Sequence, residues 1–236
     1  MIEIKGFTKR YDDKIAVDNI SLIINKGELF GFIGHNGAGK TTTIKALVGI
    51  NKIDKGDILI SGTSIKDKPL ECKKKFAYIA DNPDIYEALT GIQYINFIAD
   101  MFEVETTKRN IIIEKYATEL EIKADLGTLI SAYSHGMKQK LVIISALVHS
   151  PEIMILDEPF VGLDPKASSI VKRILRDFCN DGGIVFLTSH ILEVVERLCD
   201  RIAIIKDGKI EAEGSIKKII GDSSLEELFM GMISNE

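Results

Sequence analysis

Residues 34–41 read Gly34-His35-Asn36-Gly37-Ala38-Gly39-Lys40-Thr41 and decide how this 236-residue sequence is interpreted. They match the pattern G-x-x-x-x-G-K-[S/T], in which glycines let the backbone wrap closely around a phosphate chain. Successive N–H groups then point inward at the anion, and a following helix adds the positive end of its dipole. An apolar run over residues 29–33 precedes this phosphate loop, and a helical pattern over residues 40–50 follows it. A Gly-rich turn that matches by chance would lack this order of strand, loop and helix.

Each polar residue of the phosphate loop has a definite expected task. Lys40 supplies a mobile positive charge for the β- and γ-phosphates of a nucleotide. Thr41 offers a hydroxyl to Mg²⁺, which keeps several waters and takes phosphate oxygens as ligands. The nucleotide-binding residues predicted from this segment are Gly34, His35, Asn36, Gly37, Ala38, Gly39, Lys40, Thr41 and Thr42.

Two neighbouring acids follow a second apolar run. Residues 153–156 are Ile-Met-Ile-Leu, which is typical of a buried parallel strand, and Asp157 and Glu158 come directly after them. Open α/β sheets bind ligands at this carboxyl end of their strands. Asp157 is expected beside Mg²⁺, and Glu158 is expected to orient or deprotonate the attacking water. Solvated acids at an ordinary strand end would be about as probable if the pair stood alone, and the upstream phosphate loop favours the catalytic interpretation.

Composition narrows the class of protein. The net charge is -5, from 30 Lys and Arg against 35 Asp and Glu, so the chain carries no bulk positive field for nucleic acid. Three widely spaced cysteines form no CxxC pair, which favours a reducing compartment over a disulfide framework or zinc site. The N-terminus is no secretory signal, and the longest mostly apolar stretch, residues 141–148, is far short of the ~18 residues of a membrane span. We expect a soluble intracellular protein.

The pattern of short strands and helices predicts the organisation of the chain. Strand signals occupy the first thirty residues, and strands are also expected over residues 56–62 and 76–80. Residues 85–150 have helical spacing and begin near a capping box at Thr90 and Gln93. Strand signals return at residues 153–156, 184–188 and 202–205, and Asp207-Gly208 predicts a hairpin turn. Residues 225–232 predict an amphipathic helix.

Five elements in a fixed order resemble the ATP-binding-cassette (ABC) ATPase family, over essentially all 236 residues. Besides the phosphate loop, the five include an aromatic residue, Tyr11, near the start, and the remaining three lie on either side of the strand that ends in Asp157-Glu158. The other segments are Ser134-His135-Gly136-Met137-Lys138-Gln139, here called the signature segment, then Gly162-Leu163-Asp164-Pro165 and Thr188-Ser189-His190. The resemblance implies an α/β fold: a P-loop NTPase (RecA-like) core with an N-terminal antiparallel β subdomain and an inserted helical subdomain. The expected parts are a core with the β subdomain (1–84 and 151–220), the helical signature subdomain (85–150) and a C-terminal helix (221–236).

The resemblance also implies how ATP is bound and cleaved. Two such domains pack head to tail, and each ATP lies between the phosphate loop of one and the signature segment of the other. Ser134, Gly136 and Met137 would then grip the γ-phosphate at a helix N-terminus, and Asp164 belongs to the same nucleotide-binding set. Ser134 is equally expected to be a plain N-cap, and both roles are compatible. The family places Tyr11 against adenine and His190 on the γ-phosphate.

The sequence departs from the family pattern at two places. The signature usually reads Leu-Ser-Gly-Gly-Gln, and here Tyr133 to Met137 stand in its place, with Ser134 and Gly136 retained. The pattern S-x-G-M-K-Q and residues 223–229 resemble the subset that serves ABC-2-type exporters. Asp81 stands where the family commonly has a Gln that contacts Mg²⁺. Asp81 as a metal ligand and Asp81 as a surface acid before Pro83 remain equal alternatives.

The favoured function is a Mg²⁺-dependent ATPase that powers a transporter. The partners would be an integral-membrane permease on a separate chain and a second cassette, as a homodimer or a mixed pair, and the location would be cytoplasmic, on the inner face of the cell membrane. A DNA-repair cassette would carry long coiled coils, whereas roughly 100 residues without sustained heptads separate the phosphate loop from the signature segment. A ribosome-associated relative would have two tandem cassettes. A regulatory module without catalysis would not need Glu158 and His190.

Overall fold

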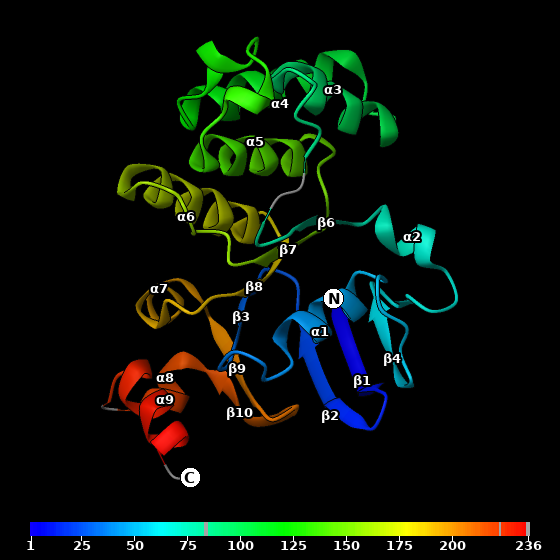
Figure 1. The fold of residues 1–236 in the computed structure, drawn as a ribbon, viewed down its shortest axis with the longest axis vertical. Coiled ribbons are helices and arrows are strands. Elements are labelled where there is room, and N and C mark those ends of the chain that lie inside the picture. The colour runs from blue at the N-terminus through cyan, green and yellow to red at the C-terminus, as the bar shows by residue number, and fades with distance from the viewer. Residues whose placement is uncertain (83–84, 222, 235–236) are drawn as a thin grey trace.

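The computed structural model describes residues 1–82, 85–221 and 223–234, and within them the strands form two sheets (Figure 1). The smaller sheet has the order β2-β1-β4-β5, and each neighbouring pair is antiparallel. Its strands are β1 (Ile2–Tyr11), β2 (Lys14–Ile24), β4 (Lys55–Ile60) and β5 (Thr63–Ser64). The predicted N-terminal antiparallel β layer is therefore confirmed.

The larger sheet has the order β10-β9-β3-β8-β7-β6. Five of its strands are parallel neighbours: β3 (Leu29–Ile33), β6 (Phe76–Ile79), β7 (Ile153–Asp157), β8 (Ile184–Thr188) and β9 (Arg201–Lys206). The edge strand β10 (Lys209–Ser215) pairs antiparallel with β9 through the predicted Asp207-Gly208 turn. Because the parallel strands run the same way, the residues that follow β3, β6, β7 and β8 meet at one edge of the sheet.

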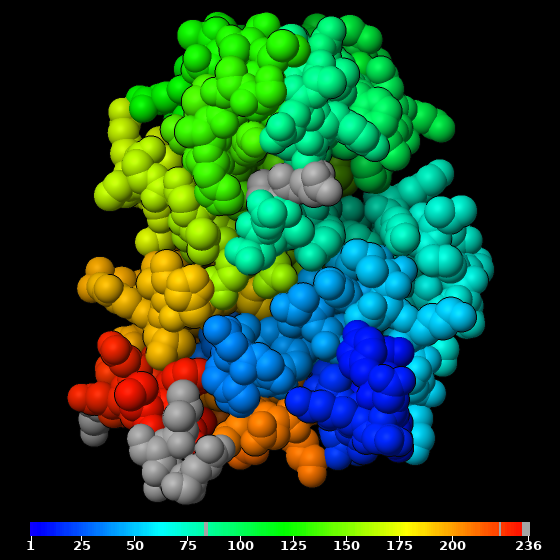
Figure 2. All heavy atoms as spheres, viewed as in Figure 1, coloured from blue at the N-terminus to red at the C-terminus, as the bar shows by residue number. Residues whose placement is uncertain are grey.

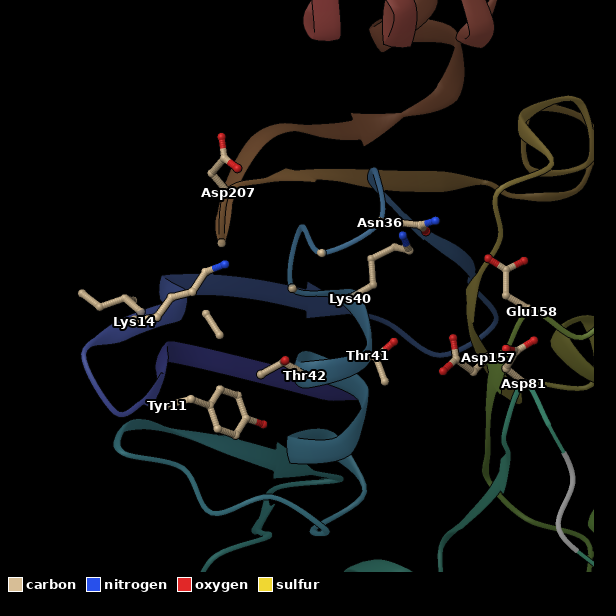
Figure 3. Close-up of a pocket in the computed structure, with 15 residues that line it drawn as sticks. Tyr11, Lys14, Asn36, Lys40, Thr41, Thr42, Asp81, Asp157, Glu158 and Asp207 are labelled. Carbon is tan, nitrogen blue, oxygen red and sulfur yellow. The ribbon is translucent and has the colours of Figure 1, made fainter.

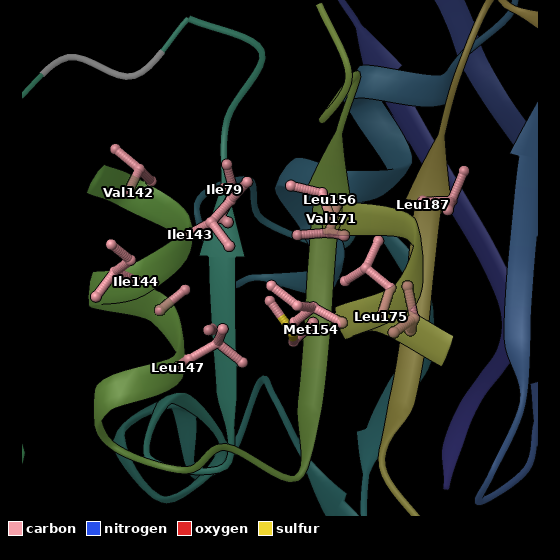
Figure 4. Close-up of a cluster of buried hydrophobic side chains, with 14 of the residues drawn as sticks. Ile79, Val142, Ile143, Ile144, Leu147, Met154, Leu156, Val171, Leu175 and Leu187 are labelled. Atoms are coloured by element: carbon pink, nitrogen blue, oxygen red, sulfur yellow. The ribbon is translucent and has the colours of Figure 1, made fainter. Parts of the chain in front are cut away.

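The parallel sheet is buried on both faces, which explains its continuous apolar runs. Alternate residues of one strand enter two different cores: Phe30 and Phe32 face the antiparallel sheet and α1 (Lys40–Leu47), whereas Leu29 and Ile33 face the opposite helices. Phe186 of β8 packs between the two β3 phenylalanines. Its ring centroid lies 5.9 Å from that of Phe30 and 5.5 Å from that of Phe32. The second core joins β6, β7 and β8 to two helices (Figure 4). These are α5 (His135–Val148) and α6 (Pro165–Asn180).

The inserted helices form a group above the parallel sheet (Figure 1). This helical group consists of α3 (Gly91–Met101), α4 (Thr106–Glu119) and α5, with the short turns η1 (Lys123–Asp125) and η2 (Ile130–Ala132). The capping box at Thr90 and Gln93 is present, with both reciprocal hydrogen bonds. The remaining helices are α2 (Pro69–Lys73), α7 (Leu192–Leu198), α8 (Ile216–Ile220) and α9 (Leu225–Ser234). In the described ranges, no helix is both long and apolar enough to span a bilayer.

Helix α6 is the main element that the sequence did not predict. Asp164 caps it by accepting a hydrogen bond from the Ala167 amide at 2.8 Å, and Pro165 takes the first helical position. Helix α1 ends earlier than expected because the chain turns at Gly49, whose φ is +69°. The predicted division into parts remains a prediction. Some boundaries of these parts lie outside the described residues, because the structure does not describe residues 83–84, 222 and 235–236. Pro83 is among them.

Candidate functional site

A cavity of about 470 Å³ opens at the edge of the parallel sheet, beside the phosphate loop (Figure 3). Ten predicted site residues line it: Tyr11, Asn36, Gly37, Gly39, Lys40, Thr41, Thr42, Asp81, Asp157 and Glu158. They come from segments far apart in the sequence. Figure 3 shows Tyr11 at one end, Asp81, Asp157 and Glu158 at the other, and Lys40 and Thr41 between them.

The phosphate loop is held by close backbone contacts. A Cβ on Gly34 would lie 2.3 Å from the carbonyl oxygen of Ile205, and Gly39 has a φ of +113° that favours glycine. The amide of Gly208, in the β9–β10 turn, donates to the carbonyl of Ala38 at 2.9 Å. In the space-filling view this orange hairpin lies against the blue N-terminal segments (Figure 2). The loop conformation is therefore set by strand β9 and its hairpin as well as by its own glycines.

Lys40 begins helix α1 and is buried. Its ammonium donates to the carbonyl oxygens of Gly34 at 2.6 Å and His35 at 3.1 Å. Burial lowers the pKa of Lys40, and the carboxylates of Glu158 and Asp157 oppose that effect. The lysine thus lies where a polyanion would gain from a desolvated positive charge and from the free N–H groups of the first helical turn.

Asp157 ends strand β7 beside Thr188, the last residue of β8. The Thr188 hydroxyl donates to Oδ1 of Asp157 at 2.5 Å. Burial raises the pKa of the Asp157 carboxyl, Asp81 adds to the rise, and the Thr188 hydrogen bond and Lys40 oppose it. A buried carboxylate beside a second acid is stabilised by a bound cation.

Glu158 occupies an unusual backbone position, with a φ of +51°. Its amide donates to the Thr188 hydroxyl at 3.3 Å, so the turn after β7 is held against the end of β8. Its Oε2 accepts from the His190 amide at 3.1 Å and pairs with His190 Nδ1 at 2.9 Å. The Glu158 side chain is 14% exposed and that of His190 is 63% exposed. The two predicted catalytic residues are therefore in direct contact, although Glu158 lines the cavity and His190 is not among its lining residues.

The signature segment lies outside this cavity. Ser134 caps α5 by accepting from the Met137 amide at 3.3 Å, as predicted. A Cβ on Gly136 would lie 2.7 Å from the carbonyl oxygen of Gly162, and Lys140 lies 3.8 Å from the Asp164 carboxylate. Ser134, Gly136, Met137 and Asp164 thus belong to a second surface, where the start of α5 meets the loop that leads into α6.

Several residues around the cavity were not predicted. Lys14, Ile15, Ala16, Asp207 and Gly208 line its rim. The Asp207-Gly208 pair carried a hairpin signal, but no sequence feature placed that hairpin on the phosphate loop. Thr188 was quoted only as part of a motif, and its contact with Asp157 depends on which strands are neighbours.

The oxygen donors at the acidic end fit a hard divalent cation. The side chains of Thr41, Asp81 and Asp157 are gathered there (Figure 3). In the part of the chain that the structure describes, no three His, Cys, Asp or Glu side chains are grouped to hold a metal by themselves. Mg²⁺ in nucleotide sites commonly takes one or two carboxylates and completes its shell with phosphate and water, so this donor set is compatible with it.

The parallel sheet, the phosphate loop and the acids at the neighbouring strand end define a P-loop nucleotide-binding domain. A family model described as "ABC transporter" matches residues 17–161. The chain is 36% identical over 211 residues to the ABC transporter ATP-binding protein YhcH of Bacillus subtilis, covering 89% of this chain and 68% of that protein. The chain therefore belongs to the ABC transporter family of ATPases, among its ATP-binding proteins. The family resemblance of the sequence is confirmed.

Other relatives and solved structures agree with this family. The Nod factor export ATP-binding protein I of Burkholderia pseudomallei is 34% identical to this chain. The match covers 93% of this chain and 72% of that protein. A structure of an ATP-binding subunit of an ABC transporter superposes with a TM-score of 0.95 at 30% identity, over 99% of this chain and 100% of that one. A dimeric cassette with bound ADP and phosphate superposes with a TM-score of 0.82 at 22% identity. The match covers 92% of this chain and 99% of that one. The last similarity shows the same fold.

Proposed function

We propose that this chain is the Mg²⁺-dependent, ATP-hydrolysing subunit of an exporter, and that it drives a separate membrane permease. The main support for this proposal is the cavity, because the phosphate loop, the buried Lys40 and the acids Asp157 and Glu158 all line it. Asp157 is buried and hydrogen-bonded to Thr188, whereas Glu158 is paired with the exposed side chain of His190. Two acids in unlike environments suit the two separate tasks of metal binding and water activation.

The phosphate loop binds the triphosphate. The ammonium of Lys40 has loop carbonyls as its present partners and exchanges them for β- and γ-phosphate oxygens. The remaining loop residues, with Thr42, supply backbone N–H groups and the helix dipole. Tyr11 stacks on the base at the far end of the cavity. Thr41, Asp157 and Asp81 hold Mg²⁺, which neutralises charge on the phosphates when bound.

Glu158 is the general base. Its carboxylate is oriented by the two hydrogen-bonding groups of His190 and takes the proton of the attacking water. Because His190 is exposed on its other side, its ring is free to contact the γ-phosphate as the site closes. His190 thereby links the base to the phosphate that is cleaved.

A pair of chains completes the site. Ser134, Gly136 and Met137 lie on a second surface, so the grip on the γ-phosphate comes from a partner cassette that packs head to tail. ATP then stabilises the closed pair, and hydrolysis releases it. Two solved structures with this fold are dimeric cassettes, which supports the pairing of two chains.

We expect the substitution Ser134→Asp to abolish pairing without unfolding the chain. Aspartate is as good an N-cap as serine, so helix α5 is retained, but its charge repels the γ-phosphate. In a Glu158→Gln background with ATP and Mg²⁺, light scattering should show twice the 26.1 kDa mass of the single chain. Adding Ser134→Asp should restore the single-chain mass. The matched change Ser131→Asp, in the same exposed region, should leave the pair intact; if it does not, or if Ser134→Asp still pairs, the head-to-tail arrangement is wrong.

The permease is proposed to dock in a groove between the helical group and the parallel sheet. This groove has a volume of about 320 Å³ and an apolar lining that includes Ile50, Tyr78, Ile98 and Phe102. Ile50 is 60% exposed, and Tyr78 lies on β6, the strand that leads to Asp81 in the nucleotide cavity. A permease segment in this groove would therefore contact the strand that leads to Asp81, a proposed metal ligand, which would couple transport to nucleotide state.

Affinity purification from detergent-solubilised membranes of the source cells should recover a protein with membrane spans. A charge in the groove wall, Ile50→Glu, should remove that protein from the purified sample because the acid is desolvated on docking. The matched change Ile111→Glu, on the exposed face of α4, should retain it. A partner without membrane spans, or equal recovery with both variants, would contradict the transport assignment.

Export is proposed from the relatives and from the signature segment. The Nod factor relatives are export ATP-binding proteins by name, and EcsA of Bacillus subtilis, an ABC-type transporter ATP-binding protein, is 28% identical over the whole chain and 98% of its own length. The location proposed is the inner face of the cell membrane, on the permease. The acidic net charge and the relatives' names disfavour a DNA-repair or translation-associated cassette.

A further inference from the structure

The ring of Tyr11 is held from two sides by residues that do not belong to the cavity. Tyr11 ends strand β1, is 46% exposed and lines the end of the cavity away from the acids (Figure 3). The side-chain amide of Asn51 donates a hydrogen bond to its hydroxyl oxygen at 2.8 Å. The ammonium of Lys9 lies 5.2 Å from the ring centroid. Within the described ranges, neither Asn51 nor Lys9 is among the residues that line the cavity.

The lysine is itself fixed in place. Lys9 donates to the Asp54 carboxylate at 3.2 Å, and its side chain is only 12% exposed. Asp54 also accepts from the Arg10 amide at 2.7 Å, and this hydrogen bond lowers the pKa of the Asp54 carboxyl. The carboxylate therefore stays ionised at neutral pH and keeps Lys9 against one face of the ring. The opposite face remains available to a ligand in the cavity.

Asn51 connects the ring to the phosphate loop. Asn51 lies just beyond the end of α1, the helix that begins at Lys40. Its backbone amide donates to the carbonyl of Lys45, inside that helix, at 2.9 Å. The hydroxyl of Tyr11 is therefore tied to the same rigid element that carries the triphosphate site. A tyrosine on an exposed strand end would otherwise rotate about its χ angles and would lose that freedom on stacking.

We propose that Asn51 and Lys9 are positioning residues that hold the Tyr11 ring ready for the nucleobase, with one face covered by Lys9 and one face open to the base. The inference rests on the proposed ATP-binding function and adds a specificity device to it. Asn51 sets the distance between ring and phosphate loop, which must match the span of a nucleoside triphosphate. Lys9 decides which face of the ring the base takes. Affinity for a base-carrying ligand depends on both, and affinity for a bare phosphate chain depends on neither.

The test compares ATP with inorganic tripolyphosphate on the full chain by calorimetric titration with Mg²⁺. Asn51→Ala should raise the Kd for ATP about two- to fivefold, the effect of losing one partly exposed hydrogen bond. The Kd for tripolyphosphate should stay unchanged. Tyr11→Phe removes the other partner of the same bond and should give a similar shift. The double variant should be no weaker than either single variant, since the two changes remove one interaction. Lys9→Met should likewise weaken ATP alone.

Asn110→Ala, an exposed asparagine on α4, is the matched control and should change neither Kd. Equal weakening of ATP and tripolyphosphate in Asn51→Ala would overturn the inference, since it would indicate a general effect on the loop. Additive effects in the double variant would also overturn it. If the wild-type chain binds tripolyphosphate and ATP with one affinity, base stacking fails while phosphate binding stands. If it binds neither, the proposed function itself fails.

Discussion

Replacing Glu158 by glutamine should reduce ATP turnover by about 10²–10⁴-fold, the contribution of a general base, while ATP binding is retained. Glutamine keeps the size of the side chain and one oxygen that can accept from the His190 amide, a contact of 3.1 Å in this chain. It loses the basic oxygen that would take the proton from water. It also removes one negative charge near the phosphates, so the Kd for ATP should stay equal or fall slightly.

The measurements are steady-state phosphate release and calorimetric titration with ATP on the same preparations. Glu193→Gln is a suitable control, because Glu193 lies on the exposed face of α7 and pairs only with Arg197 in the described structure, at 3.0 Å. This control should retain full turnover. Wild-type turnover in Glu158→Gln would exclude Glu158 as the base, and loss of ATP binding would mean that its carboxylate holds the loop rather than the water.

The parts of the cavity that were predicted from sequence are those whose chemistry is local. The phosphate loop needs its glycines, lysine and threonine in consecutive positions, and the acids need only to follow an apolar strand. Strand order is not local. The hydrogen bond from Thr188 to Asp157 exists because β8 lies beside β7, and the contact of Gly208 with Ala38 exists because β9 lies beside β3. These long-range pairings fix the site, and a single sequence does not reveal them.

Helix α6 and the contacts of Asn51 and Lys9 with Tyr11 were not predicted from the sequence, for different physical reasons. The start of α6 carries the local signals of a helix, a capping acid and a proline, but Asp164 and Pro165 were interpreted only as a motif that follows Glu158. The contacts of Asn51 and Lys9 with Tyr11 have no local signal in the sequence. Asn51 lies 40 residues from Tyr11, and Asp54 lies 45 residues from Lys9. They meet because β1 pairs with β4, which follows shortly after α1.

Replacing Gly34 by alanine should lower ATP affinity by roughly 5- to 150-fold, the equivalent of the ~1–3 kcal/mol that an extra carbon in a close-packed site typically costs. The added Cβ would lie 2.3 Å from the carbonyl oxygen of Ile205 and 2.8 Å from its Cγ2. The first of these atoms is backbone of β9, so either the loop or the strand must move. Gly34 also supplies the carbonyl that accepts from Lys40 at 2.6 Å, and a displaced loop therefore misplaces the lysine as well.

Substitutions at two other glycines test whether the loss of ATP affinity comes from this steric clash or from replacing any glycine by alanine. Gly37 has a φ of +84° but open space at its Cβ, so Gly37→Ala should be strained by about 1 kcal/mol without a clash. Gly127 meets no atom within 4 Å and has no left-handed backbone, so Gly127→Ala should bind ATP like the wild type. Calorimetric titration, with circular dichroism to verify folding, should rank the losses of affinity as Gly34 above Gly37 above Gly127. Wild-type affinity in a folded Gly34→Ala variant would show that the loop does not depend on its contact with β9, and the hairpin would then have no part in shaping the phosphate site.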